Sequence, residues 1–541
     1  MTEVRTTRTQ GSAGQPFRVL VCDHVEPAGL TALAPVAQVE SRPPMSRDEL
    51  VAVIGDYDAL MVRSATKVTA EVFEAGKRLK IVGRAGVGVD NIDVAAATRH
   101  GVIVVNSPEG NTVAAAEHAI GMMVSLSRRI PEADAAMKQG EWGRERFVGS
   151  ELYMKTLGIL GLGKIGQRVA AVARALGMRL LGFDPFLSSD KAHELGVELV
   201  ELEKLLGESD FITIHVPKTP ETTHLFAEES FKKLKPGARL INCARGGIID
   251  EEALVRAIRD GRVAGAALDV FEKEPLGESA LRELGDRVVL TPHLGASTEE
   301  AQLKVAIDVA EQIAAVLAGD PARSAVNIPS MRPEHIEPVR PFLPIAEKLG
   351  LLLGQLLEGP IRRLEVLYAG GLAERNTEPL TTAVLKGLLS GAVAEGVNYV
   401  NAPLVAKERG IEVRESKTSE QGEFTDLIEV SCEASGGRRT VAGTVFGEAN
   451  PRIVRIDDQR FNMEPVGYVL IAPHEDVPGV VGRIGTLLGE SGINIFGLQL
   501  GRKYRRGPAV MALNVDEPIA PDLLATISAL PGFHDVRCVK L

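Results

Sequence analysis

Cysteine is scarce in this 541-residue chain, which has only Cys22, Cys243, Cys432 and Cys538. The four lie far apart, and no two of them have the close spacing of a zinc cluster or of a small disulfide-stapled domain. The sequence therefore predicts no structural disulfide and no bound metal ion. It favours a reducing compartment, and we expect a cytoplasmic protein.

Long apolar runs and an excess of positive charge are missing as well. The longest apolar stretches, such as residues 102–105, have the length of a β-strand and fall far short of the roughly 20 residues of a membrane helix. Lys and Arg total 61 against 72 for Asp and Glu, giving a net charge of −11. Neither nucleic acid nor a membrane is therefore expected as a partner. Small molecules and further copies of the chain, in a homodimer or homotetramer, are expected instead.

A glycine-rich turn is the strongest local signal. Residues 156–160 are expected to form a strand and residues 164–176 a helix, and Gly161, Gly163 and Gly166 stand where the two meet. Dinucleotide-binding folds use this arrangement, because the glycines permit a tight turn, close helix packing and an approach of backbone N–H groups to a pyrophosphate. The turn therefore predicts a bound dinucleotide.

Asp184 indicates which dinucleotide is bound. It follows a second expected strand, residues 179–183, at the place where a carboxylate can accept hydrogen bonds from the adenosine ribose. A carboxylate there would repel the 2′-phosphate of NADP. The sequence therefore predicts NAD as the cofactor.

The order of strands and helices predicts an α/β protein with several domains. Two series of short β-branched runs alternating with helical patterns indicate two parallel-sheet lobes, of flavodoxin-like and Rossmann type, with a ligand cleft between them. A proline-rich stretch from residue 321 to 344 marks a boundary, and the last segment has the βαββαβ order of a ferredoxin-like module. The expected units are a loose tail, 1–16; a discontinuous substrate lobe, 17–108 and 293–325; a nucleotide lobe, 109–292; an α+β intervening domain, 330–465; and the terminal module, 467–541.

Arg245, Glu274 and His293 follow three strands of the nucleotide lobe and are the candidate catalytic residues. The carboxyl ends of parallel strands face the ligand crevice. A guanidinium can hold a carboxylate bidentately, and a histidine tuned by a carboxylate is a suitable base for oxidising a secondary alcohol by hydride transfer. Each residue taken alone also has a structural explanation, such as a helix cap or a surface ion pair.

Residues 158–166, 242–247, 268–275 and 291–298 together resemble the D-2-hydroxyacid dehydrogenase family. The resemblance implies that Arg245 holds the substrate carboxylate and carbonyl, that His293 exchanges the hydroxyl proton, and that Glu274 hydrogen-bonds the imidazole. It also implies cofactor contacts from Gly161, Gly163, Lys164, Ile165, Gly166, Asp184, Val216, Pro217, Cys243, Ala244, Asp269, Gly295 and Ala296.

The first lobe contains segments that look like the substrate loops of this family. Exposed backbone N–H groups in one glycine-rich segment would bind a carboxylate, and an arginine would bind a phosphate. Arg144 belongs to a segment that wraps the partner subunit in relatives, although a surface charge cluster explains it equally well. The candidate substrate residues are Arg63, Ser64, Gly86, Val87, Gly88, Asn106 and Arg144.

Within the family, residues 63–69, 106–111, 242–250 and 293–298 resemble those of the long phosphoglycerate dehydrogenases. Residues 476–485 and 492–495 resemble the ACT domain in which those enzymes end. This implies NAD-dependent oxidation of 3-phospho-D-glycerate, the first step of serine synthesis from that compound. The ACT resemblance implies L-serine as an effector, with His474, Asp476 and Asn494 as candidate contacts, or else a module that only assembles the oligomer. Two alternatives remain open: a dehydrogenase for glycerate or 2-hydroxyglutarate, and an NAD-sensing corepressor-like binding protein.

Overall fold

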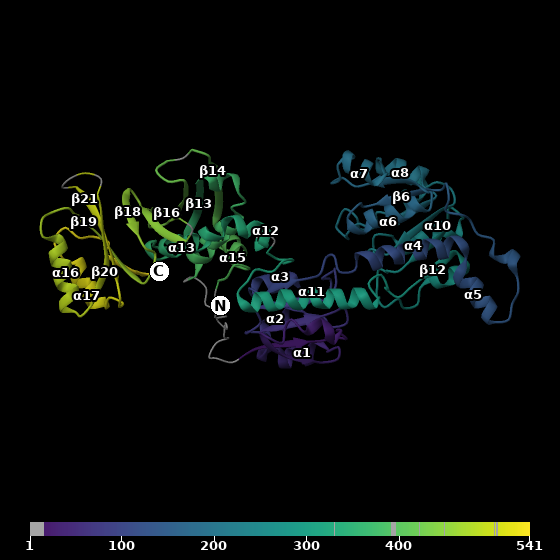
Figure 1. Cartoon of the computed structure of the whole chain (residues 1–541), viewed down its shortest axis with the longest axis horizontal. Helices are drawn as coiled ribbons and strands as arrows, with labels where there is room; N and C mark the ends of the chain where they lie inside the picture. Colours follow the sequence, from purple (N-terminus) through teal and green to yellow (C-terminus); the bar gives the residue numbers. More distant parts are fainter. Residues whose placement is uncertain are drawn as a thin grey trace, which may run out of the picture.

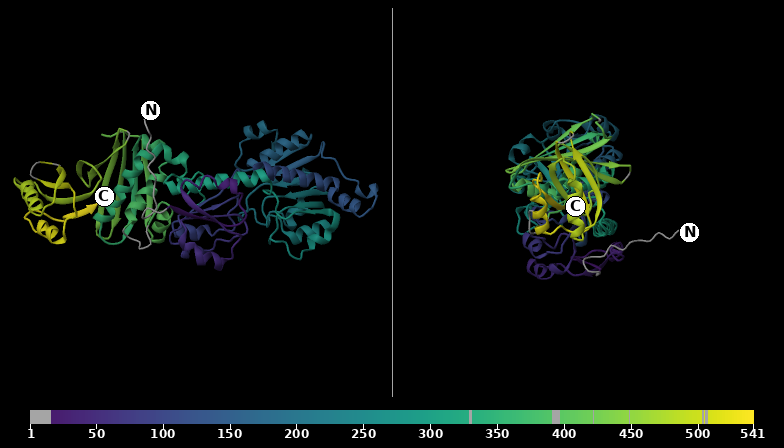
Figure 2. Two further views of the ribbon diagram at one scale, coloured as in Figure 1. Left: turned by 60° about the horizontal axis from the view of Figure 1, so that its bottom comes forward. Right: turned by 90° about the vertical axis from the view of Figure 1, so that its left-hand side faces the viewer.

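The computed structural model describes residues 16–328, 331–390, 397–420, 422–447, 449–502, 504 and 507–541. Within these residues four β-sheets, each covered by its own helices, lie in a row along the long axis of the molecule (Figures 1 and 2). The tail expected over residues 1–16 lies outside the described residues, except for Pro16. The predicted α/β class with four sheet-based units is confirmed.

The first sheet is entirely parallel and has the order β2-β1-β3-β4-β5, the flavodoxin-like order that the sequence predicts. Strands β1, β3, β4 and β5 are mostly buried, which explains their apolar character, whereas the edge strand β2 is half-exposed. The elements of this lobe are β1 (Phe17–Val21), η1 (Pro27–Leu30), β2 (Ala37–Ser41), α1 (Arg47–Val53), η2 (Ile54–Asp56), β3 (Ala59–Val62), α2 (Ala70–Ala75), β4 (Ile81–Arg84), α3 (Val94–Arg99) and β5 (Ile103–Val105).

The second sheet has the order β12-β11-β10-β9-β6-β7-β8, a doubly wound Rossmann arrangement whose order reverses beside β6. Ligands bind at such a switch point, outside the carboxyl ends of the strands. The strands are β6 (Thr156–Leu160), β7 (Arg179–Phe183), β8 (Glu198–Leu199), β9 (Phe211–Ile214), β10 (Ala238–Asn242), β11 (Val263–Leu268) and β12 (Val288–Leu290). The helices are α4 (Thr112–Arg128), α5 (Ile130–Lys138), η3 (Arg144–Phe147), α6 (Lys164–Ala175), α7 (Ser189–Leu195), α8 (Leu202–Glu208), α9 (Glu228–Lys233), α10 (Glu251–Arg259) and η4 (Ala280–Arg287).

The chain crosses between these two lobes twice. It first passes from β5 into α4, which packs on the second sheet, and it returns after β12 through α11 (Glu299–Ala318), which packs on β3 and β4. Val309 and Ile313 of α11 are fully buried in the core of the first lobe. Both crossings therefore lie beside the cleft between the lobes, and the first lobe is built from two distant segments.

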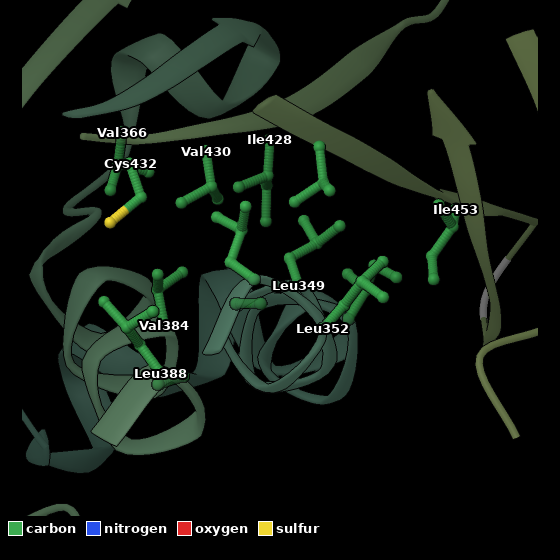
Figure 3. Close-up of a cluster of buried hydrophobic side chains, with 14 of the residues drawn as sticks. Leu349, Leu352, Val366, Val384, Leu388, Ile428, Val430, Cys432 and Ile453 are labelled. Carbon is green, nitrogen blue, oxygen red and sulfur yellow. The ribbon is translucent and has the colours of Figure 1, made fainter. Parts of the chain in front are cut away.

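The third sheet is mixed, with the order β14-β13-β15-β16-β17-β18 and two helices packed on one face. Figure 3 shows the sheet residues Ile428 and Val430 facing Leu349 of α13 and Val384 and Leu388 of α14 across a buried apolar layer. The elements are α12 (Pro333–Ile336), η6 (Glu337–Phe342), α13 (Leu343–Leu356), β13 (Ile361–Gly370), η7 (Gly371–Glu374), α14 (Glu378–Leu389), α15 (Ala402–Glu408), β14 (Glu412–Thr418), β15 (Asp426–Ala434), β16 (Gly437–Phe446), β17 (Asn450–Ile456) and β18 (Gln459–Met463).

The terminal sheet is antiparallel and has the order β20-β21-β19-β22, which is the ferredoxin-like topology predicted from the βαββαβ pattern. Its last strand is joined to α13 by two hydrogen bonds: Gln355 Oε1 accepts from Lys540 N at 2.9 Å, and Gln355 Nε2 donates to Lys540 O at 3.0 Å. The elements are β19 (Tyr468–Glu475), α16 (Val480–Glu490), β20 (Ile495–Arg502), β21 (Pro508–Val515), α17 (Pro521–Ser528) and β22 (Arg537–Lys540). Among the described residues, no helix combines the length and the apolar character needed to cross a membrane.

Candidate active site

The glycine turn between β6 and α6 has the shape of a pyrophosphate cradle. Gly161 has a φ of +88°, and a Cβ added there would lie 2.7 Å from the carbonyl oxygen of His215. A Cβ at Gly166 would lie 2.1 Å from the carbonyl oxygen of Gly161, so this position needs glycine for helix packing. At Gly163, the N-cap of α6, a Cβ would meet no protein atom within 4 Å. The space beside Gly163 is therefore open for a ligand, and the turn fits a dinucleotide.

Asp184 is fixed at the end of β7 by two backbone donors. Its Oδ2 accepts a hydrogen bond from Leu162 N at 2.7 Å, and its Oδ1 accepts one from Phe186 N at 2.9 Å. The first bond ties the carboxylate to the glycine turn. An anionic group held beside the turn in this way suits the ribose hydroxyls of NAD and disfavours a 2′-phosphate.

His293 and Glu274 form a hydrogen-bonded pair, with 2.7 Å between His293 Nδ1 and Glu274 Oε2. Glu274 Oε1 also accepts from Phe271 N at 3.0 Å, which orients the carboxylate. Burial raises the pKa of Glu274, but the hydrogen bonds from His293 and from the Phe271 amide outweigh burial and hold this pKa below its usual value. The pair is open to solvent in the cleft, and the carboxylate favours the tautomer with the proton on Nδ1.

Arg245 follows β10 and extends toward the first lobe. The turn that carries it is held by Asn242, which accepts from Ala244 N and donates to Arg245 O, both at 3.0 Å. The guanidinium reaches Asp90, with 3.4 Å between Arg245 Nε and Asp90 Oδ2. A Cβ at Gly88 would lie 2.3 Å from Arg245 Nη2, so the glycine leaves the room that the arginine occupies.

Arg245, Glu274 and His293 line one cleft of about 440 Å³ between the lobes. Of the predicted site residues, those lining it are Arg63, Ser64, Gly86, Val87, Gly88, Ile165, Val216, Pro217, Cys243, Ala244, Arg245, Glu274, His293, Gly295 and Ala296. A larger cavity of about 800 Å³ lies in the third domain against Lys540 and Leu541. None of the described residues that line that cavity is a histidine, an aspartate or a glutamate, so the smaller cleft is the candidate active site.

Comparison with known proteins agrees with this geometry. Three family models match: the D-isomer specific 2-hydroxyacid dehydrogenase NAD binding domain over residues 120–295, the D-3-phosphoglycerate dehydrogenase intervening domain over 338–457, and the ACT domain over 468–532. A D-3-phosphoglycerate dehydrogenase of Synechocystis is 53% identical, with 97% of this chain and 95% of the relative covered. One from Archaeoglobus fulgidus is 48% identical, with 93% and 96% covered.

The chain belongs to the D-3-phosphoglycerate dehydrogenase family.

It is therefore an oxidoreductase with an NAD-binding domain. Among solved structures, the D-lactate dehydrogenase of Aquifex aeolicus complexed with NAD and lactic acid is similar, with a TM-score of 0.51 and 30% identity over 56% of this chain and 96% of the other. The family's intervening and ACT domains account for the part of the chain beyond the two catalytic lobes.

Arg84 also lines the cleft, and the sequence analysis missed it. Arg84 ends β4, and a Cβ at Gly86 would lie 2.4 Å from its Nη1. Burial, followed by the positive charge of Arg245 and then of Arg63, lowers the pKa of Arg84, although Asp90 partly opposes this. Three guanidiniums thus converge on a small volume. Arg84 could have been predicted as a site residue from its position at the carboxyl end of a parallel strand, which faces the ligand crevice.

Arg63 is held in place by its neighbours. Its backbone N–H donates to Asp23 Oδ2 at 2.8 Å, and its Nη1 donates to His24 O at 2.9 Å and to Gln302 Oε1 at 3.4 Å. Asn91 Nδ2 donates to Arg63 O at 2.7 Å. These bonds tie the Arg63 loop to its surroundings, and Gln302 of α11 adds a polar group from the second crossing.

The remaining predicted residues lie outside the lining of the cleft. Asn106 donates from Nδ2 to Val87 O and so supports the glycine loop. Arg144 is in η3, and Asp269 is buried behind Gly295. The other predicted cofactor residues at the glycine turn and beside it are Gly161, Gly163, Lys164, Gly166 and Asp184.

The three candidate effector residues each have a partner within the ACT domain. Asp476 Oδ2 pairs with Arg502 Nη1 at 2.8 Å, and Asn494 Nδ2 donates to Asp516 Oδ2 at 2.7 Å. His474 is buried and stacks on Phe533, with ring centroids 5.3 Å apart. An amino-acid ligand at Asp476 would therefore compete with an intramolecular cation.

Proposed function

We propose that the chain oxidises 3-phospho-D-glycerate to 3-phosphohydroxypyruvate with NAD, the first step of serine synthesis from this compound. The observation that carries the proposal is the convergence of Arg63, Arg84 and Arg245 on the cleft that holds the His293–Glu274 pair. The substrate has a carboxylate and a phosphate, and arginine binds both groups through charge-assisted hydrogen bonds.

Each of these residues has a separate role in the proposed reaction. Arg245 holds the carboxylate end of the substrate, and Arg63 and Arg84 bind the phosphate. His293 Nδ1 is bonded to Glu274, so Nε2 is the nitrogen that takes the hydroxyl proton. Bound NAD supplies the hydride acceptor, held by the glycine turn and Asp184. Glu274 stabilises the positive charge that develops on the imidazole when the proton arrives.

A dehydrogenase for an unphosphorylated hydroxy acid would use the same His–Glu–Arg arrangement. Two features favour the phosphorylated substrate: the additional arginines Arg63 and Arg84, and the match of residues 338–457 to the intervening domain of phosphoglycerate dehydrogenases. The test is NADH formation with 3-phosphoglycerate and with D-glycerate, each with and without L-serine. We expect kcat/KM to be at least tenfold higher with 3-phosphoglycerate. Equal values would overturn the assignment of substrate.

A homodimer or homotetramer, a cytoplasmic location and L-serine as effector belong to the same proposal. The segment that includes Arg144 supports self-association, because it exposes several large apolar side chains: Trp142, Val148, Tyr153 and Met154. A second copy covering this segment would bring Arg144 toward the neighbouring active site. The ACT domain supports an effector role, with serine as its proposed ligand. Sedimentation of the purified chain tests the first point, and serine titration tests the second.

A further inference from the structure

Behind the cleft, the ends of β11 and β12 meet a histidine of α4. Asp269 follows β11 and is completely buried, Thr291 follows β12, and His118 lies in the second turn of α4. His118 Nε2 is 3.2 Å from both Asp269 Oδ1 and Thr291 Oγ1. Thr291 Oγ1 in turn donates to Asp269 Oδ1 at 2.6 Å. The three side chains form a closed network that the mechanism above does not use.

Asp269 connects this network to the loop that carries His293. Its Oδ1 also accepts from Leu294 N at 2.7 Å, and its Oδ2 accepts from Gly295 N at 2.8 Å. These are the two residues that directly follow His293. The buried carboxylate of Asp269 therefore fixes the backbone next to His293, which carries the catalytic imidazole.

The loop needs this support because His293 adopts an unfavourable backbone conformation. Its φ is +57°, in the left-handed region that costs a side-chain-bearing residue energy and persists only where the surroundings impose it. The hydrogen bonds from the backbone of Leu294 and Gly295 to Asp269 fix the two residues after His293 and so impose this conformation. The hydrogen bond from His293 N to Thr291 O, at 3.0 Å, holds it from the preceding side.

Asp269 in turn depends on side-chain donors. A buried carboxylate is costly unless donors satisfy it, and removing one leaves the desolvation cost in place. Burial raises the pKa of Asp269, but hydrogen bonds from His118 and Thr291 and from the Leu294 amide outweigh burial and hold this pKa below its usual value. His118 is the donor that comes from a different part of the chain, the helix that follows the first crossing between the lobes.

We propose that His118 is a positioning residue, which through Asp269 and Thr291 anchors the loop of His293 to helix α4. The role of His293 as base is taken from the proposed function, on which this inference rests. His118 itself does not line the cleft and does not contact the reacting atoms. Its effect should therefore appear in the chemical step more than in the binding of cofactor, because the glycine turn and Asp184 hold the adenosine half of NAD.

The test compares two substitutions of His118 in the full-length enzyme. His118→Gln keeps an N–H donor at nearly the reach of Nε2, whereas His118→Leu removes it at similar size. We expect kcat with 3-phosphoglycerate to fall about tenfold or more in His118→Leu, the size expected from losing a hydrogen bond to a buried charge. His118→Gln should stay within about threefold of wild type. The Kd of NADH, measured by fluorescence without substrate, should change less than about threefold in both.

Equal kcat values for the Gln and Leu variants, whether high or low, would overturn the inference, as would a loss confined to NADH affinity. Thr291→Val provides an independent check that does not alter α4: it removes the hydroxyl donor to Asp269 and should lower kcat in the same direction. An unchanged kcat there would also overturn it. If the wild-type enzyme does not turn over 3-phosphoglycerate, that result contradicts the proposed function and not the role of His118. The kcat values of the His118 and Thr291 variants are then compared in the reduction of hydroxypyruvate.

Discussion

Arg245 of the nucleotide lobe reaches Asp90 of the substrate lobe, with 3.4 Å between Arg245 Nε and Asp90 Oδ2. Asp90 is 78% exposed, so the attraction is weakened by solvent and a substrate carboxylate can take its place. The pair supports the proposal that Arg245 binds the substrate carboxylate, and it predicts unequal effects of two substitutions.

Arg245→Lys should lower kcat/KM for 3-phosphoglycerate by about a hundredfold, because lysine cannot present two parallel N–H donors to a carboxylate. Asp90→Asn, which removes only the exposed partner, should change kcat/KM by less than about threefold. Steady-state kinetics at saturating NAD measures both. A larger loss in Asp90→Asn than in Arg245→Lys would mean that the ion pair itself, rather than the free guanidinium, is required.

His293→Asn should lower kcat by a factor of about 100 to 10,000, the range for loss of a general base, and leave NADH affinity nearly unchanged. In the proposed binding mode, the glycine turn and Asp184, which do not touch the imidazole, hold most of the cofactor. Fluorescence titration with NADH provides the control. Equal losses of turnover and of NADH affinity would contradict the assignment of His293 as base.

Glu274 predicts a pH dependence of stability. The pKa of its carboxyl is lowered in the folded protein, where bonds from His293 and Phe271 outweigh burial. The carboxylate therefore stabilises the fold above its unfolded pKa of about 4.3, and this contribution is lost as pH falls through the folded value. We expect Glu274→Gln to lower the thermal midpoint most near pH 7. The difference in thermal midpoint from wild type should become smaller as the pH falls. Glu278→Gln, which changes an exposed carboxyl of the same loop, should show no such difference. A difference in thermal midpoint between wild type and Glu274→Gln that grows as the pH falls would contradict this prediction.

Arg84 and Arg63 predict phosphate selectivity. Arg84→Gln and Arg63→Gln should each raise KM for 3-phosphoglycerate about tenfold or more, because each removes one charge-assisted bond to the phosphate. Neither should lower kcat/KM for D-glycerate by more than about threefold, and the ratio of the two substrates is the quantity to compare. If both substrates lose activity equally, these arginines hold the carboxylate or support the fold instead.

The sequence predicted the parts of the site that local patterns determine, and it missed those that depend on distant contacts. Gly161 and Gly166 were recognisable because a tight turn and a helix packed on a strand require glycine at fixed spacing. Arg84 was not predicted, because the glycine-rich pattern after β4 does not itself indicate that the arginine ending the strand faces the cleft. Nothing near His118, on an alanine-rich helix, indicates that its ring meets the ends of β11 and β12, since that contact arises only when α4 packs on the second sheet.

The ACT domain gives the last prediction, which concerns serine. Asp476 is the candidate partner for an amino-acid ammonium group, and it is paired with Arg502 at 2.8 Å. Arg502 is half-exposed, so a ligand can displace it at a cost of about 1 kcal/mol or less. Arg502→Gln should therefore tighten serine binding by up to about fivefold, and Asp476→Asn should weaken it strongly. Titration calorimetry measures both, with Arg483→Gln, an exposed arginine on α16, as the control for lost charge. If Arg502→Gln and Arg483→Gln bind serine equally, the ammonium group does not bind at Asp476. If wild type and all three variants fail to bind serine, Asp476 and Arg502 form a structural ion pair within the module.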